Sequence, residues 1–133
     1  MRFGKAGKIR RTINHTDQVS GTFYLKLLSP RIYLWQEELE TPIASGDTII
    51  GYQSYILERE GHILKIFKAA RSKKEELFQT INLKKQEDQS THVCVQDTYV
   101  STVRFNSPGD VTVTHSVKGP RKSYQMSSDY IFS

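Results

Sequence analysis

Residues 110–132 read DVTVTHSVKGPRKSYQMSSDYIF, and this stretch decides the fold that the sequence predicts. Polar and apolar residues alternate over Asp110–Lys118 and again over Lys122–Phe132, which is typical of two half-buried strands. Between them stands Gly119-Pro120, where glycine permits a positive φ and proline holds φ at about −65°. The chain is therefore expected to bend back on itself here and to form an antiparallel pair of strands.

The same alternation recurs through the rest of the chain, between further turn signals. Glu60-Gly61 separates two β-rich runs, and the residues 106–109 form an Asn-Ser-Pro-Gly turn between two more. Residues 69–77 are rich in Ala, Lys and Glu and are expected to form a helical turn or a long loop, and residues 84–90 a polar loop. The expected strands are residues 8–14, 18–28, 31–40, 48–58, 62–68, 77–83, 91–95, 98–105, 110–118 and 122–132.

About nine or ten short strands with almost no helix predict an all-β fold, either an antiparallel barrel or a sandwich. The turns are short, and no long crossover connection is evident. A meander that closes on itself also leaves no edge strand exposed. The sequence therefore favours a single up-and-down antiparallel barrel that forms one domain over residues 1–133.

The composition is that of an ordinary globular protein with a mildly basic charge. Lys and Arg number 19 against 14 Asp and Glu, which gives a net charge of +5 and permits an anionic partner without requiring one. Cys94 is the only cysteine, so an intrachain disulfide and a cysteine-rich zinc site are excluded. No apolar run approaches the roughly 20 residues that span a bilayer, and a cytoplasmic protein with no membrane span is expected.

The start of the chain is basic. It is expected to be a solvated segment that leads into the first strand, with an arm that binds nucleic acid or a membrane surface as the alternative. No recognisable ribonucleoprotein motif accompanies it, so no nucleic-acid partner is expected. The basic residues of this segment are Arg2, Lys5, Lys8, Arg10 and Arg11.

Two segments near the end of the chain gather the side chains that could carry chemistry. In the functional hypothesis they meet at one mouth of the barrel, where Arg121, Lys122 and Tyr124 hold an acid group of a ligand. The other members of the cluster orient that ligand. The candidate ligand-binding residues are His92, Asp97, Tyr99, Arg121, Lys122 and Tyr124.

The same cluster has alternative interpretations. Asp97 could pair with Arg121 or Lys122 only to pin the closing strand of the barrel. In an enzyme, His92 would carry a proton and Cys94 could act as a nucleophile. His115 shares a face with three valines, so it needs a polar partner if that face looks inward.

No catalytic residue and no metal site is assigned from the sequence. The histidines have no short ligand spacing, such as two His at i and i+4 on a helix. A haem held by a single His would leave no sequence signature, so the cofactor remains unknown.

Two motifs carry a resemblance to a known family. His92-x-Cys94-x-x-Asp97-x-Tyr99, followed by Gly119-Pro120-Arg121-Lys122-x-Tyr124, resembles an uncharacterised domain-of-unknown-function family of short proteins. The chain is similar to that family in its first half as well. The matching segments there are Arg11-Thr12-Ile13, Gly21-Thr22-Phe23 and Leu34-Trp35-Gln36-Glu37-Glu38, and Ser128-Asp129-Tyr130 matches near the end.

The resemblance implies an architecture similar to the calycin barrels, the lipocalin and fatty-acid-binding group. In those proteins a cation and a tyrosine on the last strand often hold an anionic ligand, an arrangement that Lys122-x-Tyr124 would fit. The expected function is therefore binding of a small, partly apolar and anionic molecule. The alternatives are an enzyme that uses His92, Asp97, Tyr99 and Arg121 on a small substrate, and a structural or interaction module with a filled barrel.

Overall fold

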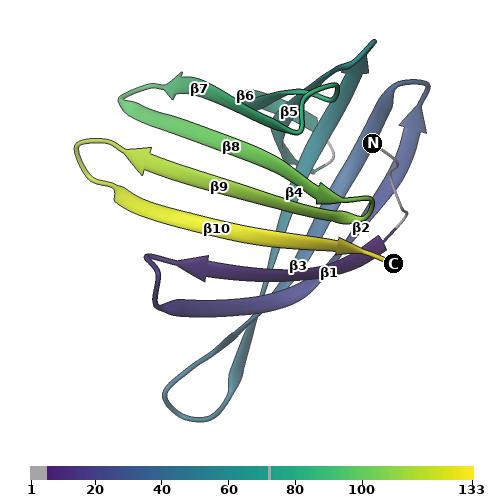
Figure 1. Cartoon of the computed structure of the whole chain (residues 1–133). Helices are drawn as coiled ribbons and strands as arrows, with labels where there is room; N and C mark the ends of the chain where they lie inside the picture. Colours follow the sequence, from purple (N-terminus) through teal and green to yellow (C-terminus); the bar gives the residue numbers. More distant parts are fainter. Residues whose placement is uncertain (1–5, 72) are drawn as a thin grey trace.

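The computed structural model describes residues 6–71 and 73–133, which form one antiparallel sheet of ten strands (Figure 1). Each strand from β1 to β6 and from β7 to β10 pairs with the next along the chain, and β1 also pairs with β10, so the sheet curls into an up-and-down barrel. The predicted all-β barrel is confirmed, and the sandwich is excluded. The strands are β1 (Ala6–Ile13), β2 (Asp17–Ser29), β3 (Ile32–Pro42), β4 (Thr48–Glu60), β5 (Ile63–Ala70), β6 (Lys73–Asn82), β7 (Glu87–Cys94), β8 (Asp97–Ser107), β9 (Asp110–Lys118) and β10 (Ser123–Phe132).

The barrel closes in two different ways at its two junctions. Between β1 and β10 an unbroken ladder runs from Gly7 paired with Phe132 to Ile13 paired with Met126. Between β6 and β7 no ladder forms within the described residues, and side chains bridge the strands instead. The Asn82 amide donates to the Asp88 carboxylate (2.8 Å), and the β6 strand makes a second such bond to the Ser90 hydroxyl.

Two expectations for the middle of the chain are wrong. Residues 69–70 and 73–77 form neither a helical turn nor a loop, because β5 continues to Ala70 and β6 begins at Lys73. Opposite charges on nearby strands favour the extended form here, as in the Lys74–Glu58 ion pair (2.8 Å). The polar loop expected over residues 84–90 is shorter, because β7 already begins at Glu87, where Glu87 faces Arg104 across the ladder.

Aromatic side chains fill much of the interior in two groups. In the first group, the Phe23 and Trp35 rings stack with centroids 4.5 Å apart, and Tyr130 and Phe132 meet them edge-on. In the second group, Phe78 packs against Tyr55, Tyr99 and His115, with ring centroids 4.8–5.7 Å apart. Such pairs add to the stabilisation that burial of the rings provides.

The two ends of the barrel carry different turns. One end, called here the predicted mouth, carries the β7–β8 turn and the β9–β10 turn around Gly119-Pro120. The opposite end, called here the terminal end, brings Ala6 and Ser133 together through a backbone hydrogen bond (2.9 Å). The β3–β4 hairpin projects beyond its neighbours (Figure 1), because β4 pairs with β5 only from Tyr55 onward.

Candidate ligand-binding site

A buried ion pair lies at the centre of the barrel. Arg11 on β1 is 3% exposed and Glu37 on β3 is 0% exposed, and an Arg11 nitrogen lies 2.9 Å from a Glu37 oxygen. Arg11 also donates to the hydroxyls of Ser128 (2.7 Å) and Tyr130 (3.0 Å). Glu37 accepts from the Tyr130 hydroxyl (2.6 Å) and from the Trp35 indole (3.0 Å). Because each charge is paired and hydrogen-bonded, the barrel tolerates both in its interior.

The position of Arg11 corrects the expectation that the first residues form a solvated basic segment. Arg2 and Lys5 lie outside the described residues, and Lys8 and Arg10 are exposed as expected. Arg11, however, points into the barrel. A signal was present in the alternation, because Arg11 has the same phase as Ile9, which is 2% exposed. Likewise, Glu37 has the same phase as Trp35.

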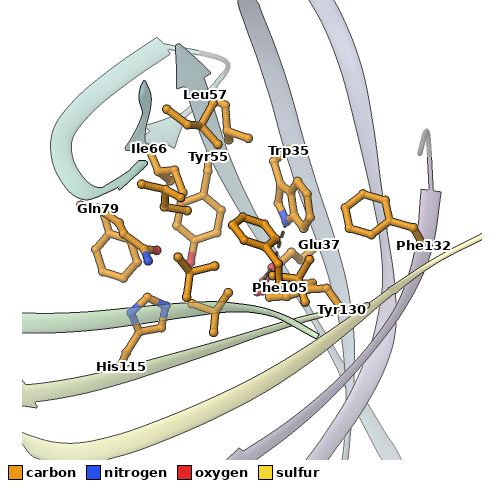
Figure 2. A pocket seen from close by; sticks show the side chains of 16 residues that line it. Trp35, Glu37, Tyr55, Leu57, Ile66, Gln79, Phe105, His115, Tyr130 and Phe132 are labelled. Atoms are coloured by element: carbon orange, nitrogen blue, oxygen red, sulfur yellow. Dashed lines mark hydrogen bonds between the residues drawn. The ribbon is translucent and has the colours of Figure 1, made fainter. Parts of the chain in front are cut away.

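A cavity of about 80 Å³ lies beside this ion pair (Figure 2). Members of both aromatic groups line it, together with aliphatic side chains of β4, β5 and β9. Its walls therefore suit an apolar molecule, and the volume is enough for several waters or one small molecule. The apolar side chains of its wall include Trp35, Leu57, Ile66, Phe78, Phe105 and Phe132.

Three uncharged polar groups point into the same interior space (Figure 2): Tyr55 on β4, Gln79 on β6 and His115 on β9. His115 has the polar partner that its position required, because its Nδ1 lies 2.7 Å from the Ser101 hydroxyl. Burial, with the positive charges of Arg11 and Lys68, lowers the pKa of His115 to about 4. Burial, with the negative charge of Glu37, raises the pKa of Tyr55. Both groups are therefore neutral at pH 7.

The structure brings some of the predicted site residues together at the predicted mouth. Lys122 Nζ lies 3.6 Å from an Asp97 oxygen, at the end where Thr98 pairs with Lys118. The backbone of Gly119 packs against Asp97 so closely that a Cβ there would lie 1.8 Å from a carboxylate oxygen. Asp97 thus holds the β9–β10 turn against β8, as the structural interpretation expected.

The other predicted residues are dispersed. His92 Nε2 contacts the Thr80 hydroxyl (3.5 Å) across the β6–β7 junction. Tyr99 is buried and accepts a hydrogen bond from Lys68 (3.3 Å), and Tyr124 is half-buried against the core. Arg121 is exposed on the turn.

None of these six candidates is among the described residues that line the cavity. Sequence reasoning gave no binding role to four polar residues that do line it: Glu37, Tyr55, Gln79 and Tyr130. Their role could not be assigned, because alternation predicts which side chains point inward but not which of them meet.

A metal-ion site and a membrane-crossing helix were also sought among the described residues. Across residues 6–71 and 73–133, no three His, Cys, Asp or Glu side chains are grouped closely enough to hold a metal ion. The same residues contain no helix of the length and hydropathy that a membrane-crossing helix needs.

Comparison with known proteins supports the fold and identifies the family. No curated protein matches the chain. Among solved structures, it is similar to a de novo designed fluorescence-activating β barrel, with a TM-score of 0.50 and 10% identity over 98% of this chain and 94% of that one. It is also similar to EF1p2_mFAP2b, solved bound to DFHBI, with a TM-score of 0.50 and 13% identity over 98% and 93% of the two chains.

At such low identity these structures show a shared barrel fold and nothing more. The family is shown by sequence, as the resemblance noted above implied. Residues 6–131 match the family described as "Family of unknown function (DUF6314)", and the chain belongs to that family.

Proposed function

We propose that this barrel binds a small, mostly apolar molecule in the cavity beside the Arg11–Glu37 pair. The observation that carries the proposal is the cavity itself, about 80 Å³ of space lined by core side chains of the barrel. A barrel that served only as a structural or interaction module would gain stability by filling that space, because empty volume forfeits packing contacts. Barrels of about this size can enclose one small ligand.

The chemistry of the walls supports the same proposal. Ligand pockets are lined mainly by apolar and aromatic side chains, with a few polar groups that orient the ligand. Here Trp35, Phe105 and Phe132 supply aromatic surface, and Gln79 and His115 lie on the side of the cavity away from Trp35 and Phe132 (Figure 2). The neighbour EF1p2_mFAP2b, which was solved with DFHBI bound, is an example of a similar barrel that holds a small molecule.

The residues predicted from the sequence would act at a different place. Arg121 and Lys122 are exposed at the predicted mouth, so an acid group that they hold stays at the rim and outside the cavity. The test compares the binding of hexanoate and of hexanol to the wild type and to Arg121→Ala. If Arg121 holds the acid group, Arg121→Ala loses affinity for hexanoate and keeps its affinity for hexanol.

The intrinsic fluorescence of Trp35 offers a direct test of the cavity, because Trp35 is the only tryptophan and lines the space. Titration with toluene is expected to change the Trp35 emission saturably. Ile66→Phe places a ring in the cavity and should weaken toluene binding at least about tenfold, since a filled site has no room for the ligand.

The control is Ile131→Phe, at an exposed position on β10, which should bind toluene like the wild type. Thermal melts of all three proteins establish that each is folded. Emission that changes linearly with toluene, or equal binding by folded Ile66→Phe, would refute the proposal.

A further inference from the structure

We infer that the ligand of this cavity is a small, uncharged molecule with a hydrogen-bonding group such as a primary amide, received by Tyr55, Gln79 and His115. The inference rests on the proposed function and names the chemical class of the ligand. It also departs from the anionic ligand that the sequence suggested.

Gln79 lines the cavity from β6. It is 2% exposed, and its Nε2 is buried without a hydrogen-bond partner among the described residues. An unpaired buried amide destabilises the folded state, so nearly all such groups in folded proteins have a partner. The Gln79 amide points into the cavity (Figure 2), where a bound molecule can supply that partner.

Tyr55 and His115 also line the cavity, from β4 and β9. The Tyr55 hydroxyl has no hydrogen-bond partner among the described residues, although the side chain is buried. His115 lines the cavity and uses Nδ1 for Ser101, which leaves Nε2 without a hydrogen-bond partner among the described residues. Three strands, β4, β6 and β9, thus direct unused hydrogen-bonding groups into one space.

The charges around the cavity disfavour an ionic ligand. Tyr55, Gln79 and His115 are all neutral at pH 7, since the pKa of Tyr55 is raised and that of His115 is lowered. The guanidinium of Arg11 and the carboxylate of Glu37 pair with each other and bond to neighbouring side chains. The Lys68 ammonium, whose charge also acts on His115, pairs with Glu76 (3.4 Å) and donates to Tyr99 (3.3 Å). An ion entering the cavity would lose its hydration without gaining an unpaired opposite charge, which is strongly unfavourable.

The donors and acceptors then select the ligand. A glutamine amide both donates and accepts, a tyrosine hydroxyl does the same, and a neutral imidazole Nε2 does one or the other. A primary amide on a ring matches this mixed set, whereas a hydrocarbon leaves all three groups unpaired. The aromatic wall formed by Trp35, Phe78 and Phe105 suits the flat face of a ring.

Three compounds with the same ring separate the possibilities: toluene, benzamide and benzoate, each titrated against the whole 133-residue chain with Trp35 fluorescence as the signal. Benzamide is expected to bind about tenfold more tightly than toluene, the gain from about one net hydrogen bond. Benzoate, which has nearly the same shape as benzamide but a negative charge, is expected to bind at least about tenfold more weakly than benzamide.

Gln79→Leu tests the residue assignment. It should lower benzamide affinity about tenfold and leave toluene affinity equal or higher, because leucine keeps the volume and removes the amide. Gln53→Leu, at an exposed glutamine on β4, is the matched control and should change neither. If Gln79→Leu does not fold, Tyr55→Phe serves the same purpose, with selective loss of benzamide affinity expected.

The outcomes distinguish the two claims. The inference is overturned if benzoate binds as tightly as benzamide, or if the folded variants bind benzamide as tightly as the wild type does. In either case, saturable binding of toluene leaves the proposed function intact. Failure of all three compounds to bind would overturn the proposed function itself.

Discussion

The Arg11 guanidinium and the Glu37 carboxylate are both shielded from water, so each needs the other for its charge to be tolerated. Tyr130 bonds to both, and Trp35 and Ser128 bond to one each. The network therefore links β1, β3 and β10 and positions one side of the cavity. Burial, reinforced by the charge of Glu37, raises the pKa of Tyr130 well above its ordinary value, so its hydroxyl remains a donor.

Replacing Glu37 by glutamine is expected to lower the free energy of unfolding by about 3–5 kcal/mol, because it leaves the Arg11 charge buried without a counter-charge. Urea denaturation measures the effect. Glu38→Gln, at the neighbouring position on the opposite face of β3, is the control and should cost less than about 0.5 kcal/mol. A cost for Glu37→Gln as small as that of the control would contradict the central role of the ion pair.

His115 makes stability depend on pH in a defined direction. Its pKa in the folded protein is about 4, below the ordinary value of 6.5, so between these values the unfolded chain binds more protons than the folded one. Stability therefore falls as pH decreases through this window, by about 2 kcal/mol from pH 7 to pH 5 from this residue alone. The measurement compares urea denaturation of wild type, His115→Gln and His62→Gln at both pH values.

His62 is exposed, so His62→Gln should lose stability like the wild type, whereas His115→Gln should lose about 2 kcal/mol less. Equal losses in all three proteins would show that His115 is not held neutral by burial. At the scale of single residues, the sequence predicted the need for a polar partner of His115 but not which residue supplies it. It placed His115 on the face of three valines and required a partner if that face looked inward, but the partner Ser101 lies on another strand and could not be named.

At the scale of strands, alternation and turn residues predicted most of the barrel. The main error, residues 69–77, arose because Lys, Glu and Ala have helical preferences that pairing between β5 and β6 overrides. Bulges in the same pairing, near Phe67, also break the regular alternation that would have revealed β6.

Close approach between strands gives a prediction at this scale. A Cβ at Gly21 on β2 would lie 1.9 Å from the backbone oxygen of Glu38 on β3, and a backbone atom cannot move aside cheaply. Gly21→Ala is therefore expected to lower the unfolding free energy by about 1–3 kcal/mol or more. Chemical denaturation checks the value.

Gly51→Ala is the control for Gly21→Ala, because Gly51 also lies in a strand but a Cβ there would meet no other atom within 4 Å among the described residues. It should change stability by less than about 1 kcal/mol, in either direction. If both substitutions had equal effects, the packing of β2 on β3 described above would be wrong.

For the whole molecule, the sequence predicted a closed cylinder but not where its closure is weakest. The ladder between β1 and β10 joins the first and last strands, whereas β6 and β7, which are adjacent along the chain, are bridged by side chains. The order of strands in a meander does not reveal which neighbours lack a ladder. For the same reason, the sequence located the candidate site at the predicted mouth, where its polar motifs gather, while the residues that line the cavity come from β3 to β6 and from β8 to β10.

The claim that a small, mostly apolar molecule enters the interior is tested most directly by methyl NMR of the isoleucines during a toluene titration. Ile66 and Ile81 line the cavity, whereas Ile49 and Ile50 are exposed on the β3–β4 hairpin and serve as internal controls. The account predicts saturable shifts of the Ile66 and Ile81 methyl signals, with those of Ile49 and Ile50 unchanged. Shifts confined to the hairpin, or no saturable shift at Ile66 and Ile81, would contradict it.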